Sequence, residues 1–249
     1  MEARWRADCA ELDGREPEPA PAYNLVTPNS SCPSCGAAIK PWQNIPVVSW
    51  IALRGKCAGC RAPISARYPA VELLTGLLSV LITWRFGYSW ATAAGLVFTW
   101  ALLALTFIDL DTQLLPDDIT LPLLWGGLLV NLSGIFIDLR SAVIGAVAGY
   151  LILWTVYWGF RLIAKKEGMG FGDFKLLAAI GAWTGWQVLP FVIVVSAGLG
   201  AVFGSIALWI SRKGTDTRIP FGPYLALGGI VALLWGRQAV TYWLGRFPA

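Results

Sequence analysis

Long stretches without a charged residue are the feature that most limits how this chain can fold. Residues 90–108 and 119–137 form two such stretches of 19 residues, and residues 141–160 form one of 20. About 20 apolar residues in a helix cross the ~30 Å hydrocarbon core of a bilayer, so each stretch predicts a transmembrane helix. The composition agrees, because 56% of the residues are hydrophobic and only 14% are charged.

Three further apolar stretches complete the predicted fold. Residues 70–84 contain one carboxylate, Glu72, and residues 219–236 contain no charge. The 35 uncharged residues 176–210 are too many for one helix, and we expect a short first helix and a turn near Gly185 and Pro190. The sequence therefore predicts an all-α polytopic membrane protein with about seven transmembrane helices, surrounded by a lipid bilayer.

The distribution of lysine and arginine predicts the orientation in the membrane. With seven alternating helices, 15 of the 19 Lys and Arg residues fall on one side, and the other side receives Arg85, Arg140, Arg237 and Arg246. Because Lys and Arg accumulate on the cytoplasmic side, we expect a cytoplasmic N-terminal region and an external C-terminus. This asymmetry also explains the net charge of +4, and no basic stripe suggests a nucleic-acid partner.

Composition changes divide the chain into three predicted regions. Residues 1–22 are polar and include the proline-rich segment EPEPAP, which is typical of a stiff linker. Residues 23–68 form a cytoplasmic loop that holds four of the five cysteines. Residues 69–249 form the membrane domain.

Two C-x-x-C pairs separated by 21 residues predict a zinc site in the loop, formed by Cys32, Cys35, Cys57 and Cys60. Four thiolates complete a tetrahedral site, and we expect Gly36 and Gly59 to permit the tight turns around it. Such a closed site is structural, as in a small zinc-ribbon-like domain. The alternative, a pair of disulfides, would suit an extracellular loop. Redox chemistry is a further alternative, and Cys9 has no predicted role.

Because the sequence contains no histidine, acid–base chemistry must come from carboxylates, lysines or tyrosines. The absence of histidine excludes Ser-His-Asp and Cys-His systems and the H-E-x-x-H zinc proteases. Acidic residues gather at the ends of predicted helices: Asp109, Asp111, Asp117, Asp118 and Asp173. Carboxylates at the edge of the hydrocarbon region are functional candidates, because ionising them there is costly.

The predicted topology places Asp109 and Asp173 on the cytoplasmic side, where two neighbouring carboxyl groups would share a proton and act as acid and base. Asp111 follows two residues after Asp109, roughly 200° further around a helix, so only one of them can face a given partner. Their spacing does not decide which one. Helix capping is the alternative for Asp173, Asp117 and Asp118. For Glu72, the alternatives are a structural pair with Arg67 and a contact to substrate.

Together the motifs resemble those of the type 4 prepilin peptidases. The resemblance rests on C-P-S-C and C-A-G-C in the loop and on R-Y-P-A-V-E at residues 67–72. It rests further on F-I-D-L-D-T-Q-L-L-P-D at 107–117, G-M-G-F-G-D-F-K at 168–175 and I-P-F-G-P at 219–223. These motifs extend from about Asn24 to the last predicted helix.

The resemblance implies an aspartyl peptidase of the bacterial inner membrane with its active site facing the cytoplasm. Such enzymes remove the basic leader of type 4 prepilins and type II secretion pseudopilins by cutting between Gly and Phe. By motif, the two catalytic aspartates are Asp109 and Asp173, which selects Asp109 over Asp111. The resemblance also implies that further residues support the site or the substrate: Gly170, Gly172, Lys175 and Glu72.

Many members of the family also methylate the new N-terminal amine with S-adenosylmethionine. They usually have a further apolar span before the cysteine loop, whereas this chain begins inside that loop. The sequence has no glycine-rich nucleotide-binding motif, so no residue is assigned to methylation.

Two other functions fit part of the pattern. A transporter or channel would use Asp109 and Asp173 as proton or cation sites, although we find no inverted repeat with paired broken helices. A methyltransferase without peptidase activity would bind its methyl donor independently of both aspartates.

Overall fold

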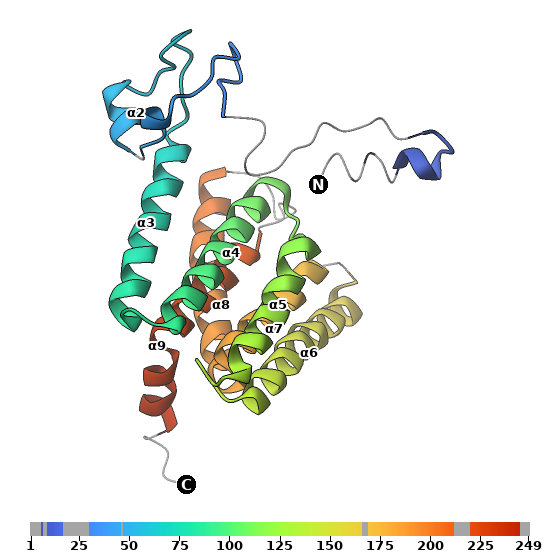
Figure 1. Ribbon diagram of the computed structural model, residues 1–249. Helices are drawn as coiled ribbons and strands as arrows, with labels where there is room; N and C mark the ends of the chain where they lie inside the picture. The colour runs from blue at the N-terminus through green and yellow to red at the C-terminus, as the bar shows by residue number, and fades with distance from the viewer. Residues whose placement is uncertain are drawn as a thin grey trace. The chain divides into compact units, whose positions relative to one another are not determined.

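The structure is a computed structural model, and it describes residues 6, 9–16, 30–45, 47–165, 169–211 and 220–244 (Figure 1). Most of the predicted linker at 1–22 lies outside these residues, including 17–22, as do two motif residues, Gly168 and Ile219. Some of the cations counted for the orientation also lie outside them: Arg4, Lys166, Arg212, Lys213, Arg218 and Arg246.

The chain folds as two compact units, Met1–Leu74 and Thr75–Ala249. The first unit contains the 3-10 helix η1 (Pro41–Asn44), the short helix α2 (Val48–Ala52) and two antiparallel bridges, Ser31 with Ala38 and Lys56 with Pro63. Among the described residues, β-structure is limited to these two bridges.

The predicted all-α membrane fold is confirmed, and the described residues contain seven long helices. They are α3 (Arg67–Phe86), α4 (Trp90–Thr112), α5 (Asp117–Leu132), α6 (Leu139–Ala164), α7 (Phe171–Thr184), α8 (Leu189–Ser211) and α9 (Gly222–Leu244). Within the described part of the chain, four segments are long and apolar enough to cross a membrane by themselves: Arg67–Phe86, Trp90–Thr112, Leu139–Ile163 and Trp186–Ser205.

Helix α7 is buried along most of its length. It packs against α5, α6 and α9, and α9 in turn packs against α4 and α8 (Figure 1). Its side chains Phe174, Leu177 and Ile180 are completely buried, and the indole N–H of Trp183 donates to the carbonyl of Leu123 at 2.7 Å. A helix that is apolar on all sides is typical of the centre of a bundle. Several helices therefore fix the position of α7.

Glycines bring the backbones of α6 and α7 into direct contact. A Cβ atom on Gly149 would lie 2.6 Å from the carbonyl oxygen of Leu177, and one on Gly145 or Gly181 would overlap the other's carbonyl oxygen. Gly145 and Gly149 are one helical turn apart, the small-residue spacing that lets membrane helices approach closely. The short distance between these two helices therefore requires glycine at these positions.

The turn predicted inside the long apolar stretch is confirmed. Helix α7 ends at Thr184, Gly185 adopts a left-handed φ of 86°, and a 3-10 turn η2 (Trp186–Val188) leads into α8. Pro190 lies in the first turn of α8, where a missing N–H is tolerated. The first helix of the pair is short, as expected.

The C-terminal ends of two predicted helices differ from the structure by five residues or more. Helix α5 stops at Leu132, five residues before the end of the apolar stretch, because Asn131 uses its side chain to satisfy the backbone N–H groups of Phe136 and Ile137. Helix α9 continues past Arg237 to Leu244. The guanidinium of Arg237 donates to the carbonyl of Phe136, so this cation has a polar partner and does not end the helix.

Helices α5 and α7 are shorter than a bilayer is thick. With 16 and 14 residues, they are about 24 and 21 Å long at 1.5 Å per residue. The hydrocarbon core measures ~30 Å, so an end of each helix lies within or at the edge of that thickness. The candidate carboxylate Asp173 lies in the first turn of α7.

Candidate active site

Asp109 lies near the C-terminal end of α4 and points into the protein. Helix α4 starts at its N-cap Ser89, whose side chain accepts a hydrogen bond from the backbone of Thr92, and ends at Gln113 in a left-handed conformation. Only 5% of Asp109 is exposed, whereas Asp111 is exposed. The helical rotation of roughly 200° between the two residues therefore buries one and leaves the other at the surface.

Asp173 is also buried, with 7% of the residue exposed. It is the third residue of α7, and its backbone N–H donates to the carbonyl of Gly170, which is the N-cap residue. Asp173 is therefore not the N-cap, and an acidic side chain in a first turn is favourable to the helix dipole. At the start of α5, the N-cap residue is Pro116, so the capping role considered for Asp117 and Asp118 is also not adopted.

The ends of α4, α7 and α9 meet around these two aspartates. The backbone N–H of Gly222, the first residue of α9, donates to Oδ2 of Asp109 at 3.0 Å in a buried hydrogen bond. Leu115 lies beside both Gly222 and Gly172, which precedes Asp173, since a Cβ atom added to either glycine would crowd its side chain. Asp109 and Asp173 are close enough to interact electrostatically. The structure thus brings together two buried carboxyl groups that are 64 residues apart in the sequence.

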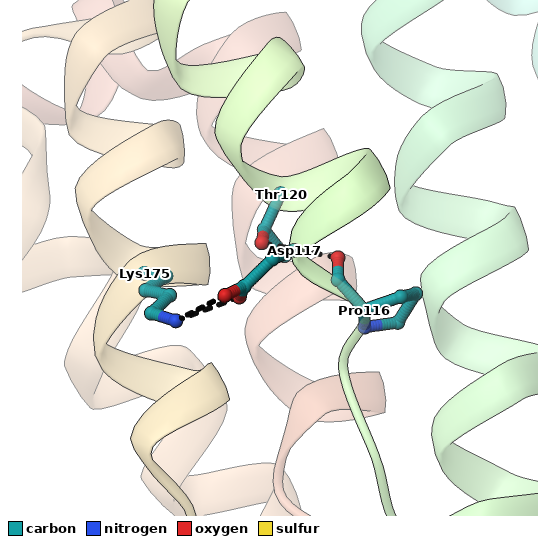
Figure 2. A network of polar contacts seen from close by, with 4 residues as sticks. All are labelled: Pro116, Asp117, Thr120 and Lys175. Carbon is teal, nitrogen blue, oxygen red and sulfur yellow. Dashed lines mark hydrogen bonds and ion pairs between the residues drawn. The ribbon is translucent and has the colours of Figure 1, made fainter. Parts of the chain in front are cut away.

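Lys175, the fifth residue of α7, pairs with Asp117, the first residue of α5 (Figure 2). Its Nζ lies 2.7 Å from both carboxylate oxygens of Asp117, and the side chains of Lys175 and Asp117 are 30% and 53% exposed. The first turn of α5 supports the pair, since Thr120 Oγ1 donates to the carbonyl of Pro116 at 3.1 Å (Figure 2). The ion pair lies two residues after Asp173 and fixes the start of α7 relative to α5.

The two motif glycines differ in their surroundings. A Cβ atom on Gly172 would lie 2.7 Å from Cβ of Leu115, so this position requires glycine for packing. A Cβ atom on Gly170 would lie 3.8 Å from Oδ2 of Asp173, which is an ordinary contact distance. Glu72 is an exposed residue of α3 in the first unit, and its predicted role remains a prediction.

The four cysteines of the loop converge as predicted. The sulfur atoms of Cys32, Cys35, Cys57 and Cys60 lie within 4.8 Å of one another, and all four are free thiols rather than disulfides. The Sγ atoms of Cys32 and Cys60 are 3.9 Å apart. A tetrahedron with Zn–S bonds of about 2.3 Å has edges of about 3.8 Å, so the Cys32–Cys60 separation already matches a zinc site and the other thiols need to move by no more than about 1 Å.

Two turns of the same design hold these thiols. Cys32 N–H donates to the carbonyl of Ala37, and Cys57 N–H donates to that of Ala62, 25 residues later in both positions. The left-handed residue is Gly36 in the first turn and Arg61 in the second. The expectation that Gly59 would permit the second turn is therefore wrong, because the positive φ falls on Arg61.

Backbone amides favour the thiolate form in both turns. The backbone N–H groups of Ser34 and Cys35 lower the pKa of Cys32 to about 6, and those of Cys60 and Gly59 lower the pKa of Cys57. The N–H of Gly59 donates to Cys57 Sγ at 3.4 Å. A metal binds the thiolate, so this arrangement suits a metal site.

Sequence reasoning missed Gly222. The segment I-P-F-G-P contributed to the resemblance without a role, and the group that contacts Asp109 is a backbone N–H, which carries no side-chain signature. The sequence does show that the next residue, Pro223, has no N–H, but this does not indicate that Gly222 binds Asp109.

Comparisons with known proteins agree with the motifs. The model of the type IV leader peptidase family matches residues 96–205, and that of the bacterial peptidase A24 N-terminal domain matches residues 15–86. No solved structure matches the chain.

Several relatives are similar over most of their length. The chain is 55% identical to a prepilin leader peptidase/N-methyltransferase of Pseudomonas aeruginosa, covering 98% of this chain and 84% of that protein. A relative of the same name from Aeromonas hydrophila is 53% identical over 99% of this chain and 86% of its own. One from Burkholderia pseudomallei is 50% identical, covering 95% of this chain and 77% of that protein.

Proposed function

The chain belongs to the type IV leader peptidase family, and we propose that it is a membrane aspartic endopeptidase that removes the leader of prepilins or pseudopilins. Asp109 and Asp173 are its proposed catalytic pair. The observation that carries this assignment is the meeting of two buried carboxyl groups, from α4 and α7, at one end of the helix bundle. The resemblance predicted from the motifs is confirmed, and nothing supports the transporter alternative.

The proposed reaction is hydrolysis by a water molecule. One aspartate, ionised, takes a proton from the attacking water, while the other, protonated, hydrogen-bonds the scissile carbonyl and then protonates the leaving amine. Two neighbouring carboxyl groups in a poor dielectric share one proton, which supplies both forms at once. The reaction forms no covalent intermediate with the enzyme.

The substrate proposed for this site is a peptide with a basic leader followed by an apolar helix, cut between Gly and Phe. The apolar helix would lie beside the transmembrane helices in the lipid. The exposed carboxylate of Asp118, at the start of α5, provides negative charge at the same end as Asp109 and Asp173, whereas Lys175 balances the charge of Asp117. The Lys175–Asp117 ion pair, Gly170, Gly172 and Glu72 are proposed as supporting residues.

The active site is proposed to face the cytoplasm of the bacterial inner membrane. At the opposite end of the second unit, the side chain of Arg85 donates to the carbonyl of Leu234 at 3.1 Å. Arg237 contacts the carbonyl of Phe136 at this end. The sequence count, with 15 of the 19 Lys and Arg residues on the side predicted to be cytoplasmic, supports the proposed orientation.

We propose that residues 23–68 form a cytoplasmic zinc domain before the membrane domain at 69–249. Cys32, Cys35, Cys57 and Cys60 would hold the ion, and a four-thiolate site stabilises the loop without offering a position for substrate. N-methylation of the new N-terminus, with S-adenosylmethionine as donor, rests on the name of the relatives. The chain has no glycine-rich nucleotide-binding motif for such a donor.

Cleavage of a prepilin by the purified protein in detergent, followed by mass spectrometry, tests the proposal. We expect Asp109→Asn and Asp173→Asn each to lower the cleavage rate by roughly 10²–10⁴, the contribution of a general acid or base. Asp111→Asn is the matched control, because Asp111 is exposed on the same helix, and it should retain the wild-type rate. Wild-type cleavage by either of the first two variants would refute the catalytic pair.

A further inference from the structure

The start of α9 contacts the carboxylate of Asp109 through its backbone. Gly222 is buried, and its N–H donates to Asp109 Oδ2 at 3.0 Å. The next residue is Pro223, which has no N–H, so it cannot provide the same hydrogen bond. Asp109 therefore depends on Gly222 for this contact.

The contact leaves no room for a side chain at position 222. A Cβ atom there would lie 2.5 Å from Oδ2 and 3.1 Å from Cγ of Asp109, and 3.3 Å from Cδ2 of Leu115. Asp173 is held less closely by Gly170, where a Cβ atom would lie 3.8 Å from Oδ2 of Asp173. Of the two carboxyl groups, Asp109 is thus the more tightly confined by backbone.

A backbone N–H donated to a carboxyl oxygen stabilises the ionised form more than the neutral one. When two carboxyl groups share one proton, this difference decides which group carries the charge. The hydrogen bond also fixes the orientation of the carboxylate, because α9 is packed against α4 and α7.

From this contact, and resting on the proposed function, we infer that Gly222 is a positioning residue that holds Asp109 ionised and aimed at the attacking water. Asp109 is accordingly the base of the pair, and Asp173 is the acid that protonates the leaving amine. The hydrogen bond from Gly222 therefore gives Asp109 and Asp173 different roles, whereas the proposed reaction alone allows either one to be the base.

The decisive variant is Gly222→Ala, measured against Gly236→Ala. A Cβ atom on Gly236 would lie 2.6 Å from Cγ1 of Val188, so the control introduces similar crowding in the same helix, away from Asp109. We expect Gly222→Ala to lower kcat for prepilin cleavage by about 100-fold, since small displacements of a reacting group have that effect. Its KM should change by less than about twofold, because Asp109 is not a substrate-binding group.

The pH profile of kcat/KM distinguishes this role from a packing effect. The added Cβ pushes the N–H donor and the carboxylate of Asp109 apart, so the acidic limb of the profile should move to higher pH in Gly222→Ala, whereas Gly236→Ala should keep the wild-type profile. The ionisable groups at this end of the helices packed against Asp109 are Asp111, Asp117, Asp118, Asp173, Lys175 and Tyr224. Asp173 is the one that interacts electrostatically with Asp109, and every variant leaves it unchanged.

A second variant covers the case in which Gly222→Ala does not fold. In a semisynthetic full-length chain, glycolic acid replaces Gly222, which exchanges the amide for an ester and removes the N–H without adding an atom. We expect kcat to fall by roughly 10- to 100-fold, the equivalent of one hydrogen bond to a charged group. A wild-type kcat and pH profile in this ester chain would overturn the inference.

The outcomes separate the inference from the proposed function. If the wild type does not cleave a prepilin, or Asp109→Asn still does, the proposed function fails. If the wild type cleaves, Asp109→Asn does not, and Gly222→Ala matches Gly236→Ala in kcat and pH profile, only the role of Gly222 is wrong.

Discussion

At the scale of single residues, the sequence led to the candidate site but not to its asymmetry. The motifs singled out Asp109 and Asp173, while helical spacing could not choose between Asp109 and Asp111. Burial separates them, since Asp109 faces the packed helices and Asp111 faces outward. That choice depends on which face of α4 meets its neighbours. The contact from Gly222 was missed because it is made by backbone.

The ion pair between Lys175 and Asp117 leads to a prediction at this scale. Because both side chains are partly exposed, we expect Lys175→Met to lower the free energy of unfolding by no more than about 1 kcal/mol. The start of α7 loses a restraint two residues from Asp173, so kcat should fall by about tenfold, less than the roughly 100-fold effect of displacing the reacting group itself.

A double-mutant cycle checks this prediction. Asp117→Asn should have a similar effect on kcat, and the combination with Lys175→Met should be no worse than either change alone. Additive losses in the double variant would show that the two side chains act independently.

At the scale of helices, uncharged stretches predicted every long helix in the described residues, and local side chains decided where each one ends. The stretch at 119–137 contains no charge to stop a helix, yet α5 ends at Leu132 because Asn131 bonds to the backbone that follows. The charge of Arg237 suggested that the last helix ends at Gly236. Helix α9 instead continues to Leu244, because the guanidinium of Arg237 donates to the carbonyl of Phe136. Such partners become known only after the helices are packed.

The contact between α6 and α7 gives a prediction for the glycines. Gly181→Ala would place Cβ against the carbonyl of Gly145, which is backbone and cannot rotate away, so we expect a loss of about 1–3 kcal/mol in stability. Gly159→Ala is the matched control on α6, since nothing lies within 4 Å of its added Cβ. Thermal unfolding in detergent measures both, and an equal Tm for the two variants would contradict the close contact.

At the scale of the whole molecule, composition and charge distribution were enough to predict a membrane protein with a separate cysteine loop. The loop could be predicted because its ligands are side chains with fixed spacing, and the resulting sulfur cluster is compact. The position of the left-handed residue was not predictable, because Arg61 rather than a glycine occupies it in the second turn.

The metal site is tested by removing one ligand. We expect the wild type to bind one zinc ion per chain and Cys32→Ser to lose it, together with stability of the loop, because metal binding and folding are coupled in such sites. Cys9→Ser is the control, since Cys9 lies outside the cluster, and it should retain zinc. Full zinc content in Cys32→Ser, measured by atomic absorption, would rule out the four-ligand site.

The side chain of Asn131 has a mechanical consequence for the second unit. Its Nδ2 donates to the carbonyls of Ala182 and Trp183, and its Oδ1 accepts from Phe136 and Ile137, all at the end away from the aspartates. Leaving a buried polar group without its partner costs about 1–3 kcal/mol, whereas an exposed ion pair such as Lys175–Asp117 contributes at most about 1 kcal/mol. Separating α5 from α7 therefore costs less free energy at Lys175 and Asp117 than at Asn131. Helices α5 and α7 can thus pivot about Asn131, and their separation varies most at the end that carries Asp173.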